Sequence, residues 1–191
     1  MSIRYNPTIT TNGLIFALDA ASRLSYPGTG SVITGLSSGV DAALVNSVSF
    51  SPDNYGYFAL DGGDDYISTN KVDLSNVKQM TACMMLKAGS STSAQMLLEF
   101  STNYNSFDDG FFVSYYDSII GYSSSIMVGR KGDVGRNIRA FNNDILSGNA
   151  WTYLSIVYDG NETKSQRCQM YVNSIKQAPS QPHSVNWDDD N

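Results

Sequence analysis

The stretch WTYLSIVYD, residues 151–159, alternates between two sets of side chains along its length. Leu154, Ile156 and Tyr158 fall on one side of an extended backbone, and the residues between them fall on the other. Successive side chains of a β-strand point to opposite faces of its sheet. The stretch therefore predicts a strand that has one face against a hydrophobic core.

Strand-like stretches of this kind recur along the chain, separated by Gly, Asn and Asp residues that favour turns. They are residues 13–20, 42–50, 57–62, 65–69, 80–87, 95–100, 110–116, 124–129, 137–141 and 167–173. No segment keeps a helical period over three turns. Many short strands without helices predict an all-β fold, a two-sheet antiparallel jelly-roll sandwich. The expected core includes Phe16, Leu18, Met84, Leu86, Leu154, Ile156 and Val172.

Length and charge restrict the classes of protein that fit. The 191 residues suit one domain with a sizeable core, and the net charge of −6 disfavours binding to nucleic acid or to anionic membranes. No stretch approaches the length of a membrane span, and the N-terminal residues lack the apolar segment of a signal peptide. Cys83 and Cys168 are too few for a secreted disulfide framework, so buried free thiols are expected.

Five segments carry a family resemblance. They are GLIFALDAASRLSYPGTG (13–30), YFALDGGDDYIS (57–68), MTACMMLK (80–87), WTYLSIVYDG (151–160) and CQMYVNSIK (168–176). In this order they resemble the laminin-G-like domains of the concanavalin A-like lectin and glucanase superfamily, in the subtype found in bacteriophage virion proteins and large bacterial surface proteins. The resemblance implies a jelly-roll domain over residues 13–191, preceded by an N-terminal arm of residues 1–12.

The acidic, glycine-rich stretch DGGDD, residues 61–65, has two interpretations. It is either a metal site or a tight turn between two strands. Glycine supplies positive φ, and Asp61 can accept hydrogen bonds from its own backbone. A calcium ion needs six or more oxygens from several loops, which one turn does not supply. The turn is therefore the favoured interpretation.

A second acidic stretch is a better candidate for calcium. LLEFSTNYNSFDDGFFVSYY, residues 97–116, is similar to the part of the pentraxin branch that contributes to a calcium site. The resemblance implies Asp108 and Asp109 as the metal ligands. The remaining ligands of that branch come from a later acidic loop, and NWDDDN at residues 186–191 does not clearly match it. A solvated Asp-Asp-Gly turn stays open as the alternative.

Signs of catalysis are weak. Glucanases of the superfamily share an E-x-D-x-x-E strand that carries the nucleophile and the acid/base, whereas this chain has only Glu99 and Glu162, far apart in sequence. His183 has no nucleophile motif beside it. The basic, glycine-rich stretch 128–137 lacks the strand-loop-helix context of a phosphate loop and favours a cationic hairpin. The chain is therefore predicted not to be an enzyme.

The resemblance and these exclusions favour a non-enzymatic structural or decoration protein of a bacteriophage virion. Such a protein is assembled in the host cytoplasm, is oligomeric, and contacts other virion proteins in the head, neck or tail. The alternative is a lectin-like module that binds surface glycans through loops carrying Tyr and Asp. The twelve tyrosines suit protein contacts and sugar contacts equally.

A last expectation concerns the closing strand of the family, which lies beside the segment matching residues 13–19. No such strand follows CQMYVN at residues 168–173. The sandwich is therefore expected to be incomplete at its C-terminal end. Either a longer polypeptide or a neighbouring subunit would supply the missing strands, because an unpaired sheet edge recruits another strand.

Overall fold

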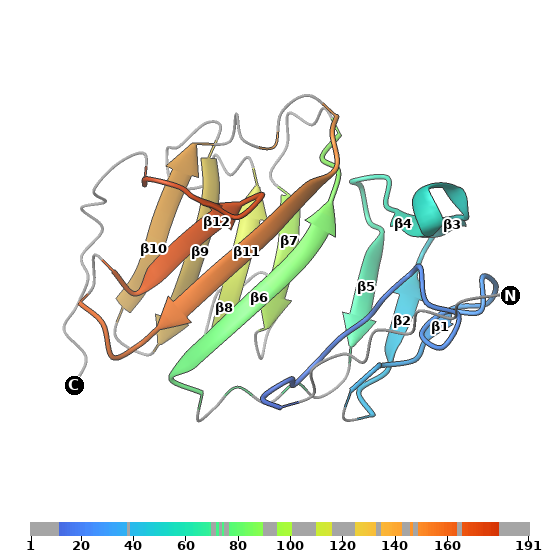
Figure 1. Cartoon of the computed structure of the whole chain (residues 1–191), viewed down its shortest axis with the longest axis horizontal. Coiled ribbons are helices and arrows are strands. Elements are labelled where there is room, and N and C mark those ends of the chain that lie inside the picture. Colours follow the sequence, from blue (N-terminus) through green and yellow to red (C-terminus); the bar gives the residue numbers. More distant parts are fainter. Residues whose placement is uncertain are drawn as a thin grey trace, which may run out of the picture. The chain divides into compact units, whose positions relative to one another are not determined.

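The computed structural model describes residues 12–37, 39–69, 72, 74, 77–89, 95–100, 110–115, 125–132, 135–142, 146, 149–163 and 166–179. The chain divides into two compact units, residues 1–73 and residues 74–191. The sheets of both units are antiparallel, and the regular structure of the described residues comprises strands and short 3-10 turns (Figure 1). The predicted all-β class is confirmed. Among the described residues, no helix is long and apolar enough to span a membrane.

The first unit contains two small sheets that share one core. Tyr26, Ile33 and Ala42 are buried in it. The rings of Phe50 and Phe58 pack against Tyr26, with ring centroids 5.1 and 5.0 Å from it. One sheet has the order β1-β2-β5 and the other pairs β3 with β4. The elements are β1 (Val32–Ile33), β2 (Ala42–Val45), β3 (Ser49–Ser51), the 3-10 turn η1 (Asp53–Tyr55), β4 (Tyr57–Ala59) and β5 (Tyr66–Thr69).

Two strand predictions in this unit are wrong. Residues 42–50 form two strands, β2 and β3, because the chain turns at Asn46, which has a φ of 63°. Residues 13–20 form no strand. The buried hydroxyl of Ser25 instead accepts the Asp19 amide at 3.1 Å and donates to the Thr34 carbonyl at 2.7 Å. Side-chain hydrogen bonds of this kind compete with strand pairing.

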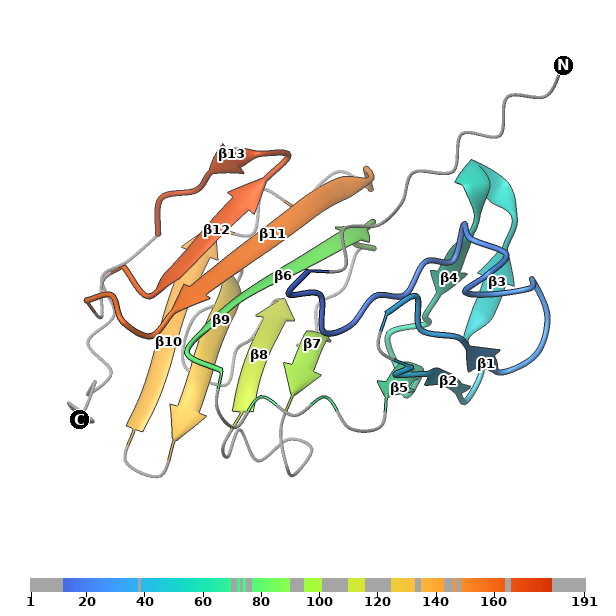
Figure 2. The same ribbon diagram turned by 60° about the horizontal axis from the view of Figure 1, so that its bottom comes forward.

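The second unit is a sandwich of two four-stranded sheets, with orders β13-β12-β11-β6 and β10-β9-β8-β7. Figure 2 shows the two sheets facing each other. One hydrophobic cluster takes buried residues from both sheets, among them Val113 of β8 and Ile156 of β11. The strands are β6 (Gln79–Leu86), β7 (Gln95–Phe100), β8 (Gly110–Tyr115), β9 (Ser125–Gly132), β10 (Gly135–Asn142), β11 (Thr152–Asp159), β12 (Cys168–Val172) and β13 (Ile175–Lys176).

Most of the predicted core is confirmed. Leu154, Ile156 and Val172 are buried, and Met84 and Leu86 are half-buried against them. Leu18 packs against the core of the first unit, and Phe16 is half-buried. Burial alternates along β6 and along β11, as the sequence pattern predicts. The division of the chain into an arm and a domain over residues 13–191 stays a prediction.

Candidate functional site

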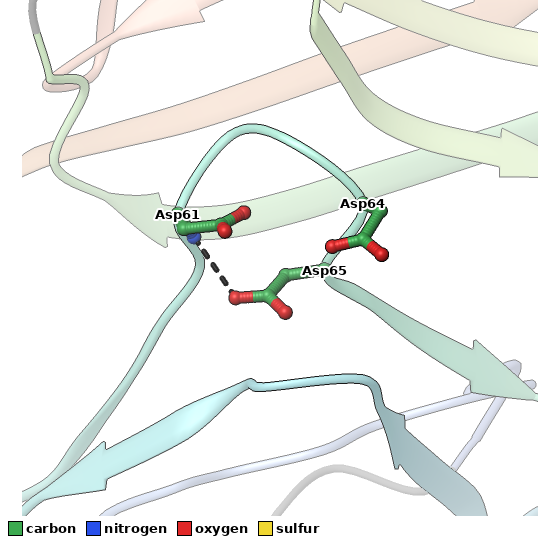
Figure 3. A group of neighbouring side chains, drawn as sticks. All are labelled: Asp61, Asp64 and Asp65. Atoms are coloured by element: carbon green, nitrogen blue, oxygen red, sulfur yellow. Dashed lines mark hydrogen bonds between the residues drawn. The ribbon is translucent and has the colours of Figure 1, made fainter.

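The acidic turn between β4 and β5 is built from hydrogen bonds to its own backbone. Asp65 accepts the amide of Asp61 at 3.0 Å on one carboxylate oxygen and the amide of Ser47 at 2.7 Å on the other. Asp61 accepts the amide of Gly63 at 2.7 Å. Figure 3 shows Asp61, Asp64 and Asp65 around the turn, with the bond from Asp61 to Asp65. These bonds fix the path of the loop.

The turn interpretation of this stretch is confirmed. Gly62 has a φ of 77°, and the Asp61 carboxylate bonds the backbone two residues further on. The turn does not make a hairpin, however, because β4 pairs with β3 whereas β5 pairs with β2. Asp65 and the Asn46 side chain, which donates to the Asp64 carbonyl, tie this turn to the turn between β2 and β3. Its role is to connect the two sheets of the first unit.

Asp61, Asp64 and Asp65 are also the candidate ligands for a metal ion at this turn. One carboxylate oxygen from each of Asp61, Asp64 and Asp65 lies within 4.8 Å of the others. Asp61 and Asp64 are exposed, and the oxygens of Asp65 already accept backbone amides. A hard cation takes six to eight oxygens, and this turn offers fewer. The geometry explains the aspartates as turn residues and assigns no metal to them.

The predicted calcium ligands, Asp108 and Asp109, lie outside the described residues. His183 lies outside them as well. Glu99 stands on β7, and Glu162 stands in the exposed turn after β11, so the two glutamates belong to different parts of the second unit. The described parts of the basic stretch, residues 128–132 and 135–137, lie on the antiparallel strands β9 and β10, with Gly132 opposite Gly135, which agrees with the predicted hairpin.

The outward face of the sheet β13-β12-β11-β6 carries exposed apolar and aromatic side chains, and we call it the outer face. Met85 of β6 is 61% exposed, and Tyr153 lies opposite it on β11. Trp151, directly before β11, is also exposed on this face. Ile175 of β13 is exposed as well, but it pairs with the buried Val172 and so belongs to the opposite face. Because every second residue of a strand points the same way, Cys83, Ser155 and Tyr171 continue the outer face. Its charged residues within the strands are Asp159 at the end of β11 and Lys176 of β13, opposite Tyr171.

Cys83 and Tyr153 interact on the outer face. The Cys83 thiol donates to the Ser155 hydroxyl across the strand pair at 3.5 Å. A hydrogen bond with Cys83 raises the pKa of Tyr153, and partial burial adds to the rise. Both side chains are solvent-accessible. The expectation that both cysteines are buried is therefore wrong for Cys83 and correct for Cys168.

The loop between β3 and β4 displays one aromatic side chain. Tyr55 is 93% exposed and has a φ of 74°, a conformation that is strained for a bulky residue. Asn54 before it also has positive φ, at 53°. Gly56 closes the loop with a φ of 119°, where a Cβ atom would lie 2.7 Å from the Ala20 carbonyl oxygen. The loop is thus packed closely at its base and presents Tyr55 at its tip.

A cavity of about 130 Å³ lies in the second unit, beside β12 and β13. Three glutamines, Gln166, Gln169 and Gln177, are among the residues that line it. The volume suits a few water molecules. The residues that line it supply hydrogen-bond donors but no carboxylate or imidazole: they are Phe141, Gln166, Cys168, Gln169, Lys176, Gln177 and Pro179.

Sequence reasoning missed the outer face and the Tyr55 loop. The alternation of residues 80–87 identifies which side chains point outward, but not that they remain uncovered. The segment PDNYG, residues 52–56, carries the proline, asparagine and glycine of a turn between two aromatic strands, and that signal predicts the hairpin. Comparison of the chain with family models, with curated proteins and with solved structures gives no match in any of the three.

Proposed function

We propose that the chain is a non-enzymatic structural or decoration protein of a bacteriophage virion. Its jelly-roll sandwich, of the laminin-G-like type, holds a contact surface for other virion proteins, and the particle is assembled in the host cytoplasm. The order of the five motifs in residues 13–176 supports the family, and the antiparallel sandwich of the second unit is consistent with it. A rigid sandwich with sparse charge suits display on a particle.

The observation that carries this proposal is the exposure of the outer face. Cores of protein interfaces are poor in charged residues and rich in Tyr, Trp and Met. Met85, Tyr153 and Trp151 bring these side chains to one solvent-facing sheet. A strand surface of that composition is costly to leave in water, and a neighbouring virion protein would cover it.

The test is the presence of the chain in purified particles. Gradient-purified phage from a lysate that expresses the gene should contain the protein by mass spectrometry, in a fixed copy number per particle. Met85→Lys should lower its incorporation, because the added charge would be buried in the contact. Glu162→Gln, in an exposed turn, should incorporate normally. Particles that lack the protein would overturn the proposal, and polysaccharide cleavage by the pure protein would overturn its non-enzymatic part.

A second candidate function is a carbohydrate-binding module, favoured by the Tyr55 loop. Sugars stack their apolar faces on aromatic rings and bond their hydroxyls to carboxylates and amides, and Asp53 and Asn54 stand next to Tyr55. Binding of the pure protein to a glycan array, lost in Tyr55→Ala and kept in Tyr66→Ala, would support this role. Tyr66 is the matched control, since it is also an exposed tyrosine of the first unit.

Calcium binding through Asp108 and Asp109 belongs to the same proposal. A bound ion stabilises the folded state by mass action, so millimolar calcium should raise the melting temperature and a chelator should lower it. The double variant Asp108→Asn/Asp109→Asn should lose this response. Asp64→Asn should keep the response to calcium, because the geometry of the acidic turn assigns no metal to its aspartates. A melting temperature that is indifferent to calcium would count against a structural ion.

A further inference from the structure

Among the described residues of the second unit, burial differs from strand to strand. Its fully buried residues come mainly from β8, β11 and β12. Among the described side chains, the half-buried apolar residues that pack against this core lie on β6 and β7 or directly after β6, and β6 and β7 are end strands of their sheets. The half-buried residues are Met80, Ala82, Met84, Leu86, Ala88, Leu97, Leu98 and Phe100.

Three end strands of this unit, β13, β7 and β6, differ in the features that discourage pairing with another strand. Proteins protect sheet edges with charges, bulges or very short strands. β13 has two residues and includes Lys176, and β7 has a register shift and Glu99. β6 has none of these features. Its eight residues, QMTACMML, contain no charge and no proline, and its pairing with β11 is regular throughout.

We propose that β6 pairs antiparallel with β6 of a second copy of this chain, about a two-fold axis through Cys83. A shift of one residue in the register would place inward side chains of one strand beside outward side chains of the other. The register must therefore pair inward residues with inward residues. With Cys83 on the axis, Met80 faces Leu86 of the partner subunit, and Ala82 faces Met84 of the partner subunit. The four apolar residues of each strand are thereby all matched.

The composition of β6 favours a second copy over an unrelated strand. An antiparallel pair of identical strands is self-complementary when nothing along it repels its own copy, and two-fold dimers are the commonest assemblies. At the strand ends, Lys87 of one copy would approach Lys78 and Asp159 of the other, so that the carboxylate offsets the two ammonium groups. Asp159 is already held there by the Gln79 amide, at 2.8 Å.

This pairing continues the sheet β13-β12-β11-β6 from one copy into the next. It would satisfy the outward backbone groups of β6 and cover the half-buried side chains of Met80, Met84 and Leu86. It would also join the two outer faces into one larger surface. The inference rests on the β6 edge alone and does not depend on the virion role.

Sedimentation equilibrium of the full chain over a concentration series tests the proposal. The wild type should show a monomer–dimer equilibrium. Cys83→Lys places two like charges on the two-fold axis and should raise the dimer dissociation constant about tenfold or more. Cys83 is exposed, so this variant should fold, as circular dichroism would check. Ser155→Lys, its register neighbour on β11, is the matched control and should leave the dimer intact.

Mild oxidation supplies a second readout. Cys83 residues that face each other should form a covalent dimer, which Cys83→Ser should abolish. Cys168→Ser should not affect it, since Cys168 is buried. A wild-type chain that stays monomeric at every concentration would overturn the proposal. A dimer that is indifferent to Cys83→Lys, or that forms no Cys83 cross-link, would overturn it as well.

Discussion

β6 and β11 are neighbours in one sheet and differ in how completely they are buried. Both have eight residues, and both alternate between inward and outward side chains. Leu154 and Ile156 of β11 are 0% exposed, whereas Met84 and Leu86 of β6 are half-buried. β11 has strands on both sides, while β6 pairs only with β11 among the described strands. The comparison teaches that the pattern sets the direction of each side chain, and that the neighbouring strands set its burial.

The largest expected effect is the loss of a fully buried side chain from β11. Leu154→Ala should lower the free energy of unfolding by about 3–5 kcal/mol, because it removes apolar contacts and leaves a cavity. Met84→Ala, opposite it on β6, should cost only about 1–2 kcal/mol, since solvent and relaxation fill the half-open site. Urea denaturation at a concentration that keeps the chain monomeric measures both values.

Equal losses for the two variants would break the comparison, because they would mean that β6 is as enclosed as β11 in the monomer. The slope of the denaturation curve should be the same for wild type and both variants. A changed slope would indicate that unfolding is no longer two-state, and the values would then not be comparable.

An intermediate loss of stability is expected in the acidic turn. There the Asp65 carboxylate accepts two backbone amides, whereas the Asp64 side chain is exposed. Asp65→Ala removes the acceptor of two backbone amides and should cost about 1–3 kcal/mol. Asp64→Ala should change stability by less than about 0.5 kcal/mol, since its side chain is exposed. Thermal or urea unfolding compares the pair. A larger loss for Asp64→Ala would show that its carboxylate has a role beyond the turn.

The all-β class and the alternation of β6 and β11 could be predicted because they depend on local pattern. Leu154, Ile156 and Val172 were identifiable as core residues for that reason. The strand over residues 13–20 could not be excluded, because the bonds of Ser25 that redirect the chain join residues six and nine positions apart, which the two-residue alternation of a strand does not reveal. The pairing of β5 with β2, and not with the preceding strand β4, likewise depends on contacts that the pattern does not encode.

The candidate site was predictable only in part. The backbone bond of Asp61 and the positive φ of Gly62 follow from residue type, so the turn could be read from the sequence. The bridge from Asp65 to Ser47 could not, since it spans eighteen residues. The exposure of Met85 and of Tyr55 was also unpredictable, because a sequence pattern does not say which outward faces remain uncovered.

The smallest expected effect concerns the polar bond that joins the ends of β6 and β11. The Gln79 amide, and then the Asn161 backbone amide, lower the pKa of Asp159. A carboxyl whose pKa is lower in the folded state stabilises the fold above its unfolded pKa, about 3.9, and this contribution is lost as the pH falls through the folded value. Gln79→Ala should therefore slightly reduce the loss of unfolding free energy that occurs as the pH falls through the acid range. Gln169→Ala should leave this pH dependence unchanged.

Hydrogen exchange of β6 and β11, measured at low and high protein concentration, tests the central contrast most directly. At low concentration, β11 amides should be strongly protected, and the outward amides of β6 should exchange quickly. At high concentration, β6 should gain protection while β11 stays the same, because a second copy pairs with its edge. Strong protection of all β6 amides at low concentration would contradict this account.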